Sequence, residues 1–236
     1  MKSTNIPVPA VRRLSLYLRQ LENVWRAEQH KISSRQLGSA LKLTDAQVRK
    51  DLAYFGQFGR AGIGYDVEAL IKKIRRILGT DRLWNVVLVG AGNLGMALSA
   101  HRGFAKKGFR IVGIFDTDPR KIGQPVHSLD DMVIESVDKI AAVVRERDAR
   151  LAIVAVPAEA AQDIADRLTA AGIKGLLNFA PVSLDVKSRV AVSSVDLAVQ
   201  LEQLSFQVGT VALPDEAVAA RRPRRVVRGR KRGGSE

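Results

Sequence analysis

The residues with the most evident chemistry are three glycines, Gly90, Gly92 and Gly95, spaced as Gly-x-Gly-x-x-Gly. An apolar run typical of a buried strand precedes them, and a helical pattern follows at once. Such a turn lets the chain bend sharply, lets backbone approach a pyrophosphate and lets the helix pack against the strand. The free N–H groups and the positive dipole end of that helix then face the phosphates. We therefore predict a dinucleotide cradle formed by Gly90, Ala91, Gly92, Asn93, Leu94 and Gly95.

A carboxylate follows at the place where a dinucleotide site needs one. Asp116 lies about 21 residues beyond Gly95, where the apolar run 109–115 ends, and Thr117 comes next. Asp116 would accept hydrogen bonds from the adenosine ribose, and its charge would repel a 2′-phosphate, so we expect NAD(H) rather than NADP(H). The alternatives are a glycine turn without a ligand and a cradle for the phosphates of CoA, which Asp116 disfavours.

The segments around this motif predict a Rossmann-type parallel sheet. Strands are expected near 109–115, 150–156 and 175–180, with helices near 136–147 and 158–171 between them. This alternation favours right-handed crossovers, and ligands of such sheets bind beyond the carboxyl ends of the strands. The pocket should therefore also be lined by Pro157, Asn178, Ala180 and Pro181.

The chain offers this pocket no evident acid–base group. Its three histidines are His30, in the N-terminal third, His101, which we expect on the first helix after the glycine turn, and His127. Neither His101 nor His127 has an evident carboxylate partner nearby in sequence. Hydride transfer needs a proton-transferring partner, and the chain beyond Ala180 is too short for a substrate domain. We predict no catalytic residue and no metal site, so the protein is not an enzyme; an NAD-dependent oxidoreductase with an accessory nucleic-acid domain is the alternative.

Charge is concentrated at the two ends of the chain. The net charge is +14, and residues 1–78 hold 15 Lys and Arg against 6 Asp and Glu, while residues 79–220 hold 15 against 17. Residues 221–236 hold 8 against 1. A basic N-terminal third next to a nearly neutral nucleotide-binding part suggests a polyanionic partner.

The N-terminal third has the pattern of a winged helix-turn-helix domain. A helix over 10–28 has an apolar stripe of Val11, Leu14, Leu18, Leu21 and Trp25. Ser33-x-x-Gln36 and Thr44-x-x-Gln47 each have the form of a capping box and open two further helices, the second reaching about Phe55. The glycine-rich stretch 56–65 predicts a β-hairpin wing, and Asp66 caps a fourth helix that ends at Gly79. A helical packing domain with solvated charges is the alternative.

The second helix of such a motif enters the major groove of DNA. Arg49 and Lys50 are our candidates for base-edge contacts, and Gln47 and Tyr54 also face outward. Arg12, Arg13 and Arg60 are expected to contact phosphates, which position a protein without specifying sequence.

The C-terminal part is predicted to be an amphipathic helix followed by a basic tail. Leu197, Leu201, Leu204 and Val208 share one helix face, which would dock on its own domain or on a second subunit. Because helix-turn-helix proteins usually present two copies to a pseudo-palindromic site, the second use is favoured. The expected organisation is a DNA-binding domain (1–79), a Rossmann domain (80–193), a dimerisation helix (194–212) and a disordered tail (213–236).

Composition sets the remaining bounds. Hydrophobic residues make up 46%, no segment has the length to cross a bilayer, and no signal peptide precedes the first helix. The absence of cysteine excludes disulfides, Cys-type zinc sites and thiol catalysis, and fits a cytoplasmic location.

In combination, these segments resemble the Rex family of redox-sensing transcriptional repressors, over residues from about 9 to 209. The resemblance is carried by 13–19, 47–56, 62–65, 90–95, 178–181 and 195–197. It implies a homodimer with a swapped C-terminal helix that reaches the partner's nicotinamide pocket. It also implies binding to double-stranded operator DNA when NADH is scarce and release when NADH, the regulatory ligand, binds.

The resemblance further implies that Asp196 and Arg19 form a switching contact between pocket and DNA-binding domain, with Leu197 next to it in the swapped helix. Two features depart from the family pattern. His101 stands where the family commonly has Tyr, in the same polar switch, and the basic tail from Arg221 lies outside the shared pattern.

Overall fold

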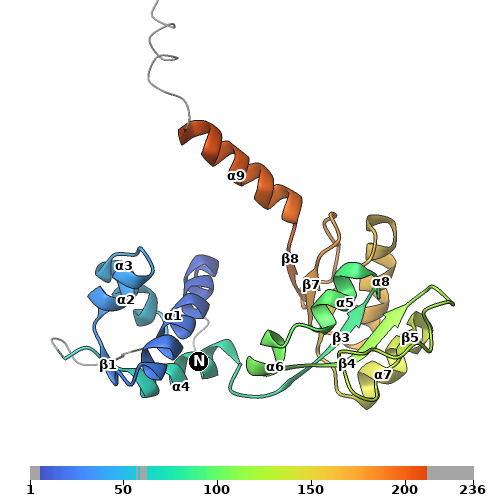
Figure 1. The fold of residues 1–236 in the computed structure, drawn as a ribbon, viewed down its shortest axis with the longest axis horizontal. Helices are drawn as coiled ribbons and strands as arrows, with labels where there is room; N and C mark the ends of the chain where they lie inside the picture. The colour runs from blue at the N-terminus through green and yellow to red at the C-terminus, as the bar shows by residue number, and fades with distance from the viewer. Residues whose placement is uncertain (1–5, 57, 59–62, 212–236) are drawn as a thin grey trace, which may run out of the picture.

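The computed structural model describes residues 6–56, 58 and 63–211. It places an N-terminal group of four helices beside a larger α/β unit, and the chain passes from one to the other between α4 and β3 (Figure 1). The tip of the predicted wing, with Arg60, and the basic tail lie outside the described residues.

Three of the N-terminal helices begin at their predicted caps, whereas the first runs two residues earlier than the predicted range 10–28. The helices are α1 (Val8–Arg26), α2 (Ser34–Ala40), α3 (Asp45–Ala53) and α4 (Val67–Leu78). Ser33 and Gln36 form the predicted capping box, and the side chains of Thr44 and Asp66 accept hydrogen bonds from the first turns of α3 and α4. Helix α4 ends at Gly79, whose φ of 70° is the left-handed conformation that glycine adopts easily.

The packing face of α1 differs from the predicted stripe at both ends. Leu14, Leu18 and Leu21 are buried, but Val11 and Trp25 are 40% and 38% exposed, and Ala10 and Tyr17 are buried in their place. Two short strands that the sequence did not indicate separately, β1 (Lys31–Ile32) and β2 (Tyr65–Asp66), pair antiparallel. The described end of the glycine-rich stretch is therefore joined to the start of the helix-turn-helix.

The α/β unit is a six-stranded parallel sheet of Rossmann type. In chain order, its strands are β3 (Trp84–Val89), β4 (Phe109–Asp116), β5 (Ile134–Ser136), β6 (Leu151–Val154), β7 (Gly175–Asn178) and β8 (Ala191–Ser194). The order across the sheet is β5-β4-β3-β6-β7-β8, and every pairing is parallel. The order reverses between β3 and β6, so ligands are expected at the carboxyl ends of those two strands.

Helices cover the two faces of the sheet unequally. A 3-10 turn (Val137–Lys139), α7 (Ile140–Glu146) and α8 (Ala158–Ala171) pack together on one face. The short helices α5 (Asn93–Ser99) and α6 (Gly103–Lys106) lie on the other face beside β3 and β4. The described chain between β7 and β8 contains no helix, so this second face is left uncovered over β6, β7 and β8.

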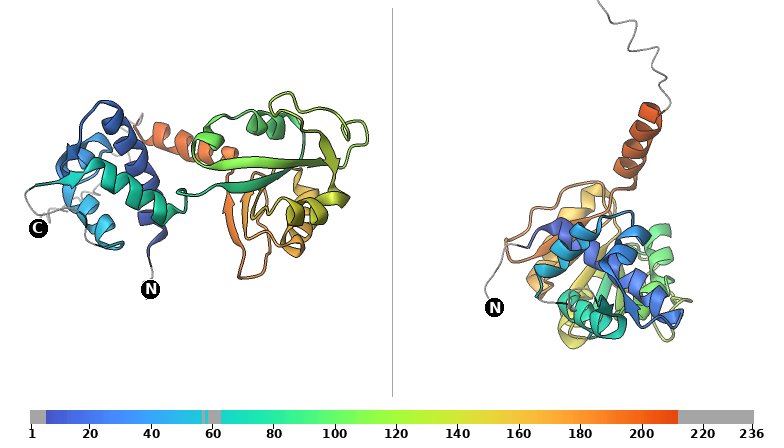
Figure 2. Two further views of the ribbon diagram at one scale, coloured as in Figure 1. Left: turned by 90° about the horizontal axis from the view of Figure 1, so that it is seen from below. Right: turned by 90° about the vertical axis from the view of Figure 1, so that its left-hand side faces the viewer.

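The last helix, α9 (Leu197–Val211), packs on neither unit. Figures 1 and 2 show it extending away from the end of β8. Its apolar residues Leu201, Leu204 and Phe206 are 67%, 54% and 72% exposed. Among the described residues, no helix combines the length and the apolar character that a membrane span requires.

An acidic residue connects the two units. Glu22 of α1 accepts hydrogen bonds from Arg75 of α4 at 3.0 Å and from Lys107, just beyond α6, at 2.6 Å. Burial raises the pKa of Glu22, but the two cations outweigh it and hold that pKa below its ordinary value. Glu22 is therefore a carboxylate shared between the helical unit and the α/β unit.

Candidate functional site

The glycine turn has the geometry of a phosphate cradle. Gly90 has φ +101°, and a Cβ there would lie 2.3 Å from the carbonyl oxygen of Ala155. A Cβ at Gly95 would lie 1.8 Å from the carbonyl oxygen of Gly90, so α5 sits as close to the turn as backbone allows. At Gly92, by contrast, a Cβ would meet nothing within 4 Å. The first and third glycines are thus needed by the fold, and the second opens toward free space.

Asp116 lies beside this turn and is held in a fixed orientation. Its carboxylate accepts hydrogen bonds from the backbone N–H of Ala91 at 2.8 Å, from that of Asp118 at 2.9 Å and from Nζ of Lys121 at 3.0 Å. Burial raises the pKa of Asp116, but the Asp118 N–H, Lys121 and the Ala91 N–H together keep it below its ordinary value. Asp116 is therefore an anion.

A pocket of about 350 Å³ joins the turn and the carboxylate at the switch point of the sheet. Five of the predicted ligand residues line it: Gly90, Gly92, Asp116, Thr117 and Pro157. Ala91, Asn93, Leu94 and Gly95 belong to the same turn and helix start without lining this cavity. A cradle that a Cβ would fill, beside a buried anion, fits the pyrophosphate and ribose of a dinucleotide.

The residues at the end of β7 differ from the expectation. Asn178, Ala180 and Pro181 do not line this pocket. The Asn178 side chain is fully buried, donates to the carbonyl oxygens of Ala180 and Val182, and accepts from the N–H of Ala180. In this chain, Asn178 fixes the turn after β7. Any contact of Ala180 and Pro181 with the nicotinamide half of a ligand stays a prediction.

Two cations in the pocket were not found from the sequence. Lys121 pairs with Asp116, and Arg167 of α8 pairs with Asp163 at 2.8 Å. Lys121 follows Asp116 by five residues in a polar loop, and nothing in that spacing distinguishes it from a solvated lysine. Because these titratable lining residues are paired with each other, the pocket presents no unpaired acid or base to a ligand.

The proposed DNA-reading helix α3 is anchored by a buried carboxylate, Asp51. It is fully buried and accepts from two nitrogens of the Arg13 guanidinium, from the Tyr17 hydroxyl at 2.7 Å and from Nε2 of Gln47 at 2.7 Å. Burial raises the pKa of Asp51, but Arg13, Tyr17 and Gln47 hold it below its ordinary value. The prediction that Arg13 contacts phosphate is therefore corrected: its guanidinium is turned inward, where it neutralises Asp51.

The other predicted DNA contacts are on the surface. Lys50, Tyr54 and Arg12 are exposed, and within the described residues Arg12 and Lys50 form no ion pair. Arg49 is exposed but donates to Asp45 at 2.7 Å and to Ser34 at 3.2 Å. A base contact by Arg49 would thus require exchange of these partners. Gln47 is half-buried, because its amide reaches back to Asp51 instead of completing the second capping box.

Within the described part of the chain, no hydrogen bond or ion pair joins the predicted switch residues Arg19, His101 and Asp196. Asp196 caps α9 by accepting from the N–H groups of Ala198 and Val199, and Arg19 is exposed without an ion pair among the described residues. His101 was predicted on α5 but lies just beyond its end. Its ring packs edge-on against that of Phe104, with the ring centroids 4.9 Å apart. Leu197 is 60% exposed at the start of α9.

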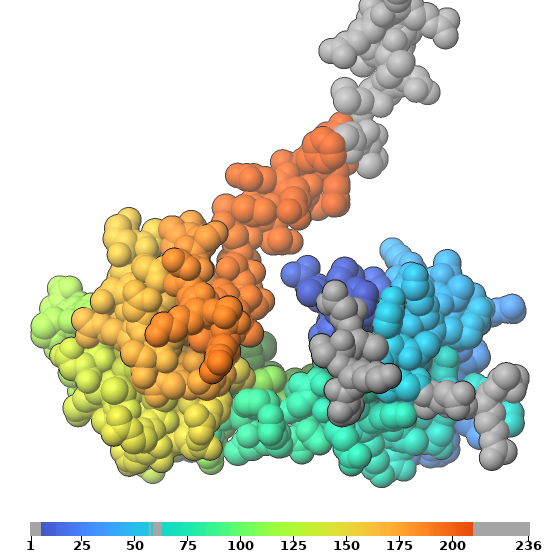
Figure 3. Space-filling view, turned by 180° about the vertical axis from the view of Figure 1, so that it is seen from behind, coloured from blue at the N-terminus to red at the C-terminus, as the bar shows by residue number. Residues whose placement is uncertain are grey.

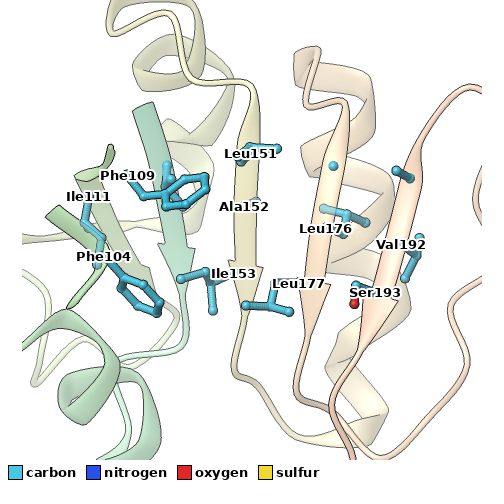
Figure 4. Close-up of a pocket in the computed structure, with 13 residues that line it drawn as sticks. Phe104, Phe109, Ile111, Leu151, Ala152, Ile153, Leu176, Leu177, Val192 and Ser193 are labelled. Carbon is cyan, nitrogen blue, oxygen red and sulfur yellow. The ribbon is translucent and has the colours of Figure 1, made fainter. Parts of the chain in front are cut away.

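An apolar groove of about 360 Å³ lies over the uncovered part of the sheet. Figure 4 shows its lining, which comes from β3, β4, β6, β7 and β8 together with Phe104 of α6. Figure 3 shows α9 standing clear of both units. Among the described residues of the single chain, nothing covers two apolar surfaces, which are the groove and helix α9.

Fold and site together define a class of protein, the transcription regulators in which a winged helix-turn-helix domain is joined to a dinucleotide-type Rossmann domain. Comparison with known families agrees with both parts. Residues 5–53 match the family "Putative DNA-binding protein N-terminus", and residues 81–182 match the family "CoA binding domain".

Whole-chain relatives define the family more closely. The redox-sensing transcriptional repressor Rex of Carboxydothermus hydrogenoformans is 50% identical over 88% of this chain and 99% of its own. That of Desulfitobacterium hafniense is 46% identical over 89% and 99%. The structure of RSP in complex with β-NAD⁺ and operator DNA has a TM-score of 0.85 at 35% identity, covering 93% and 99% of the two chains. The RSP complex with β-NADH has a TM-score of 0.79 at 33% identity, covering 92% and 99%. The chain belongs to the Rex family of redox-sensing transcriptional repressors.

Proposed function

We propose that this chain represses transcription as a homodimer that binds palindromic operator DNA and is released when NADH binds. The observation that carries the proposal is the pocket in which an open glycine cradle meets the buried anion Asp116, in a chain that also carries a helix-turn-helix. Solved relatives hold β-NADH in one case, and β-NAD⁺ with operator DNA in another.

The pocket of the single chain accounts for the adenosine and pyrophosphate half of the ligand. The turn from Gly90 to Gly95 would hold the pyrophosphate, and Asp116 with Thr117 would hold the adenosine ribose. When bound, NAD(H) would supply a redox-dependent charge and ring shape at its nicotinamide. A chain that distinguishes the two forms must contact that ring, for which Pro157, Ala180, Pro181 and a partner's α9 are the proposed groups.

In this proposal the ligand is a signal and no reaction is catalysed. The lining residues include no histidine or tyrosine, and the acids Asp116 and Asp163 are paired with Lys121 and Arg167. Hydride transfer to a substrate needs a positioned proton donor or acceptor, which these pairs do not provide. An oxidoreductase is therefore the weaker candidate. We also propose a cytoplasmic location, because a repressor acts in the compartment that holds its operator DNA.

The dimer follows from the two uncovered apolar surfaces. Large exposed apolar surfaces commonly mark sites where another molecule binds. A second copy of the chain would supply an α9 to cover the groove of the first copy and a groove to receive the first copy's α9. We propose that each α9 crosses to the other subunit, which would also carry Asp196 and Leu197 toward the Arg19 and His101 of its partner. Two helix-turn-helix domains would then meet two half-sites.

DNA contacts in the proposal are made by α3 and its neighbours. Lys50, Gln47 and Tyr54 would face the major groove, the exposed Arg12 would contact a phosphate, and Arg49 would join them after leaving Asp45. A phosphate contact by Arg60, which lies outside the described residues, stays a prediction. NADH can release DNA only if it binds the DNA-incompetent dimer more tightly. Operator DNA must then weaken NADH binding by the same factor.

A gel-shift titration on a palindromic promoter fragment tests the proposal, with NADH, NAD⁺, NADPH and CoA in parallel. Release by NADH at micromolar concentration, with NADPH and CoA inactive, is the expected result. Indifference to all four ligands would refute the sensor, and turnover of NADH with a small carbonyl compound would restore the oxidoreductase.

A further inference from the structure

The buried carboxylate of Asp51 does more than neutralise Arg13, because it also fixes the orientation of the Gln47 amide. An ionised carboxylate can only accept hydrogen bonds, and the pKa of Asp51 is lowered, so the Gln47 atom that meets it must be a donor. That atom is Nε2, at 2.7 Å from Oδ1 of Asp51. The Gln47 oxygen is therefore turned away from the carboxylate.

Gln47 lies at the end of α3 that would meet DNA. It is the third residue of α3, and the N-terminal turn of a recognition helix is the part that touches base edges. Its backbone is fixed by the Thr44 cap, whose hydroxyl oxygen accepts from the Gln47 N–H at 3.1 Å. Its side chain is fixed four residues further on by Asp51, which Arg13 and Tyr17 in turn hold against α1.

With one N–H bound to Asp51, the Gln47 amide presents an acceptor, Oε1, and one remaining N–H donor. Adenine offers the complementary pair in the major groove, a donor at N6 and an acceptor at N7, whereas guanine offers two acceptors. We infer that Gln47 is a specificity-determining residue that reads an adenine in each operator half-site, and that Asp51 is the positioning residue that keeps its amide in the reading orientation. This inference rests on the proposed DNA-binding function.

The first experiment measures binding of the full-length protein to an operator fragment and to fragments in which each base pair of one half-site is replaced in turn. Wild-type protein should show a position where adenine is preferred by about 5- to 150-fold, the range for a bidentate base contact. In Gln47→Ala, that preference should fall to twofold or less, while preferences at the other positions remain. Lys187→Ala, an exposed change in the Rossmann unit, serves as the matched control.

An atomic substitution in the DNA tests the contact without relying on protein folding. Replacing the adenine by 7-deazaadenine removes the N7 acceptor and should weaken wild-type binding but leave Gln47→Ala unaffected. Asp51→Asn, which lets the facing group donate as well as accept, should reduce the adenine preference more than it reduces binding to non-specific DNA.

The outcomes separate the inference from the function on which it rests. Sequence-specific binding in which Gln47→Ala keeps every base preference overturns the adenine reading alone. The same holds if 7-deazaadenine weakens both proteins equally. Absence of sequence-specific binding by wild-type protein overturns the proposed repressor function and this inference with it.

Discussion

Gly92→Ala should separate ligand binding from folding. The added Cβ would meet nothing within 4 Å in the protein, and the backbone at Gly92, with φ −82° and ψ −174°, is open to any residue. Loss of glycine at a helix N-cap costs about 0.5–1 kcal/mol. Replacing glycine by alanine also lowers the conformational entropy of the unfolded chain, which stabilises the folded protein by about 0.4–1 kcal/mol. The free energy of unfolding should therefore change little.

The same methyl group occupies the space through which a pyrophosphate would approach. Forcing one extra methyl group into a close-packed contact costs about 1–3 kcal/mol. This corresponds to an increase of roughly 5- to 150-fold in the Kd for NADH. Calorimetric titration with NADH gives the Kd, and urea unfolding of the same protein gives the stability.

Gly95→Ala provides the contrast, because its Cβ would lie 1.8 Å from the carbonyl oxygen of Gly90. The free energy of unfolding of that variant should fall by about 1–3 kcal/mol or more. If Gly92→Ala bound NADH within twofold of wild type, the assignment of the open glycine to the phosphates would be wrong. Equal destabilisation by the two substitutions would refute the reading of their geometry.

Three further predictions concern other parts of the molecule. Leu201→Glu places a charge on the exposed apolar face of α9, so light scattering should show a monomer, and a persistent dimer would exclude this face from the interface. Asp116→Asn removes the charge that would repel a 2′-phosphate and leaves Lys121 without this partner. Titrations should therefore show the ratio of NADH affinity to NADPH affinity falling at least about tenfold. An unchanged ratio would contradict this role of Asp116. Asp51→Asn leaves the Arg13 charge without a counter-ion and should cost about 3–5 kcal/mol at neutral pH. Because the pKa of Asp51 is lower in the folded than in the unfolded protein, the stability advantage of the wild type is complete above the unfolded pKa and should shrink below roughly pH 4. Urea unfolding at several pH values measures this advantage, and an advantage that stays constant down to roughly pH 3 would contradict the prediction.

Features set by local sequence were predictable. The caps at Ser33, Thr44 and Asp66 and the glycine turn each depend on a few neighbouring residues whose chemistry allows few conformations. The end of β4 at Asp116 was also predictable, because an apolar run stops there. These signals were enough to predict the helix-turn-helix, the Rossmann sheet and the position of Asp116 at the end of β4.

Features set by distant partners were not predictable in the same way. Arg13 and Asp51 are 38 residues apart, and nothing in either segment indicates that the arginine is turned inward. Strand β5 has only three residues and all four residues of β8 are exposed, so neither has the apolar run that indicated β6 and β7. Lys121 and Arg167 enter the pocket only because a loop and α8 are brought to the same edge of the sheet.

The position of Glu22 determines the electrostatic cost of moving one domain relative to the other. Glu22 is only 14% exposed, and a lone carboxylate in that position would resist separation from its partner. Arg75, however, belongs to the same helical domain as Glu22 and stays with it when Lys107 of the Rossmann domain departs. The departing Lys107 is 42% exposed and is readily hydrated. The two domains can therefore rotate apart without leaving a carboxylate uncompensated, and the joint is easier to open as ionic strength rises.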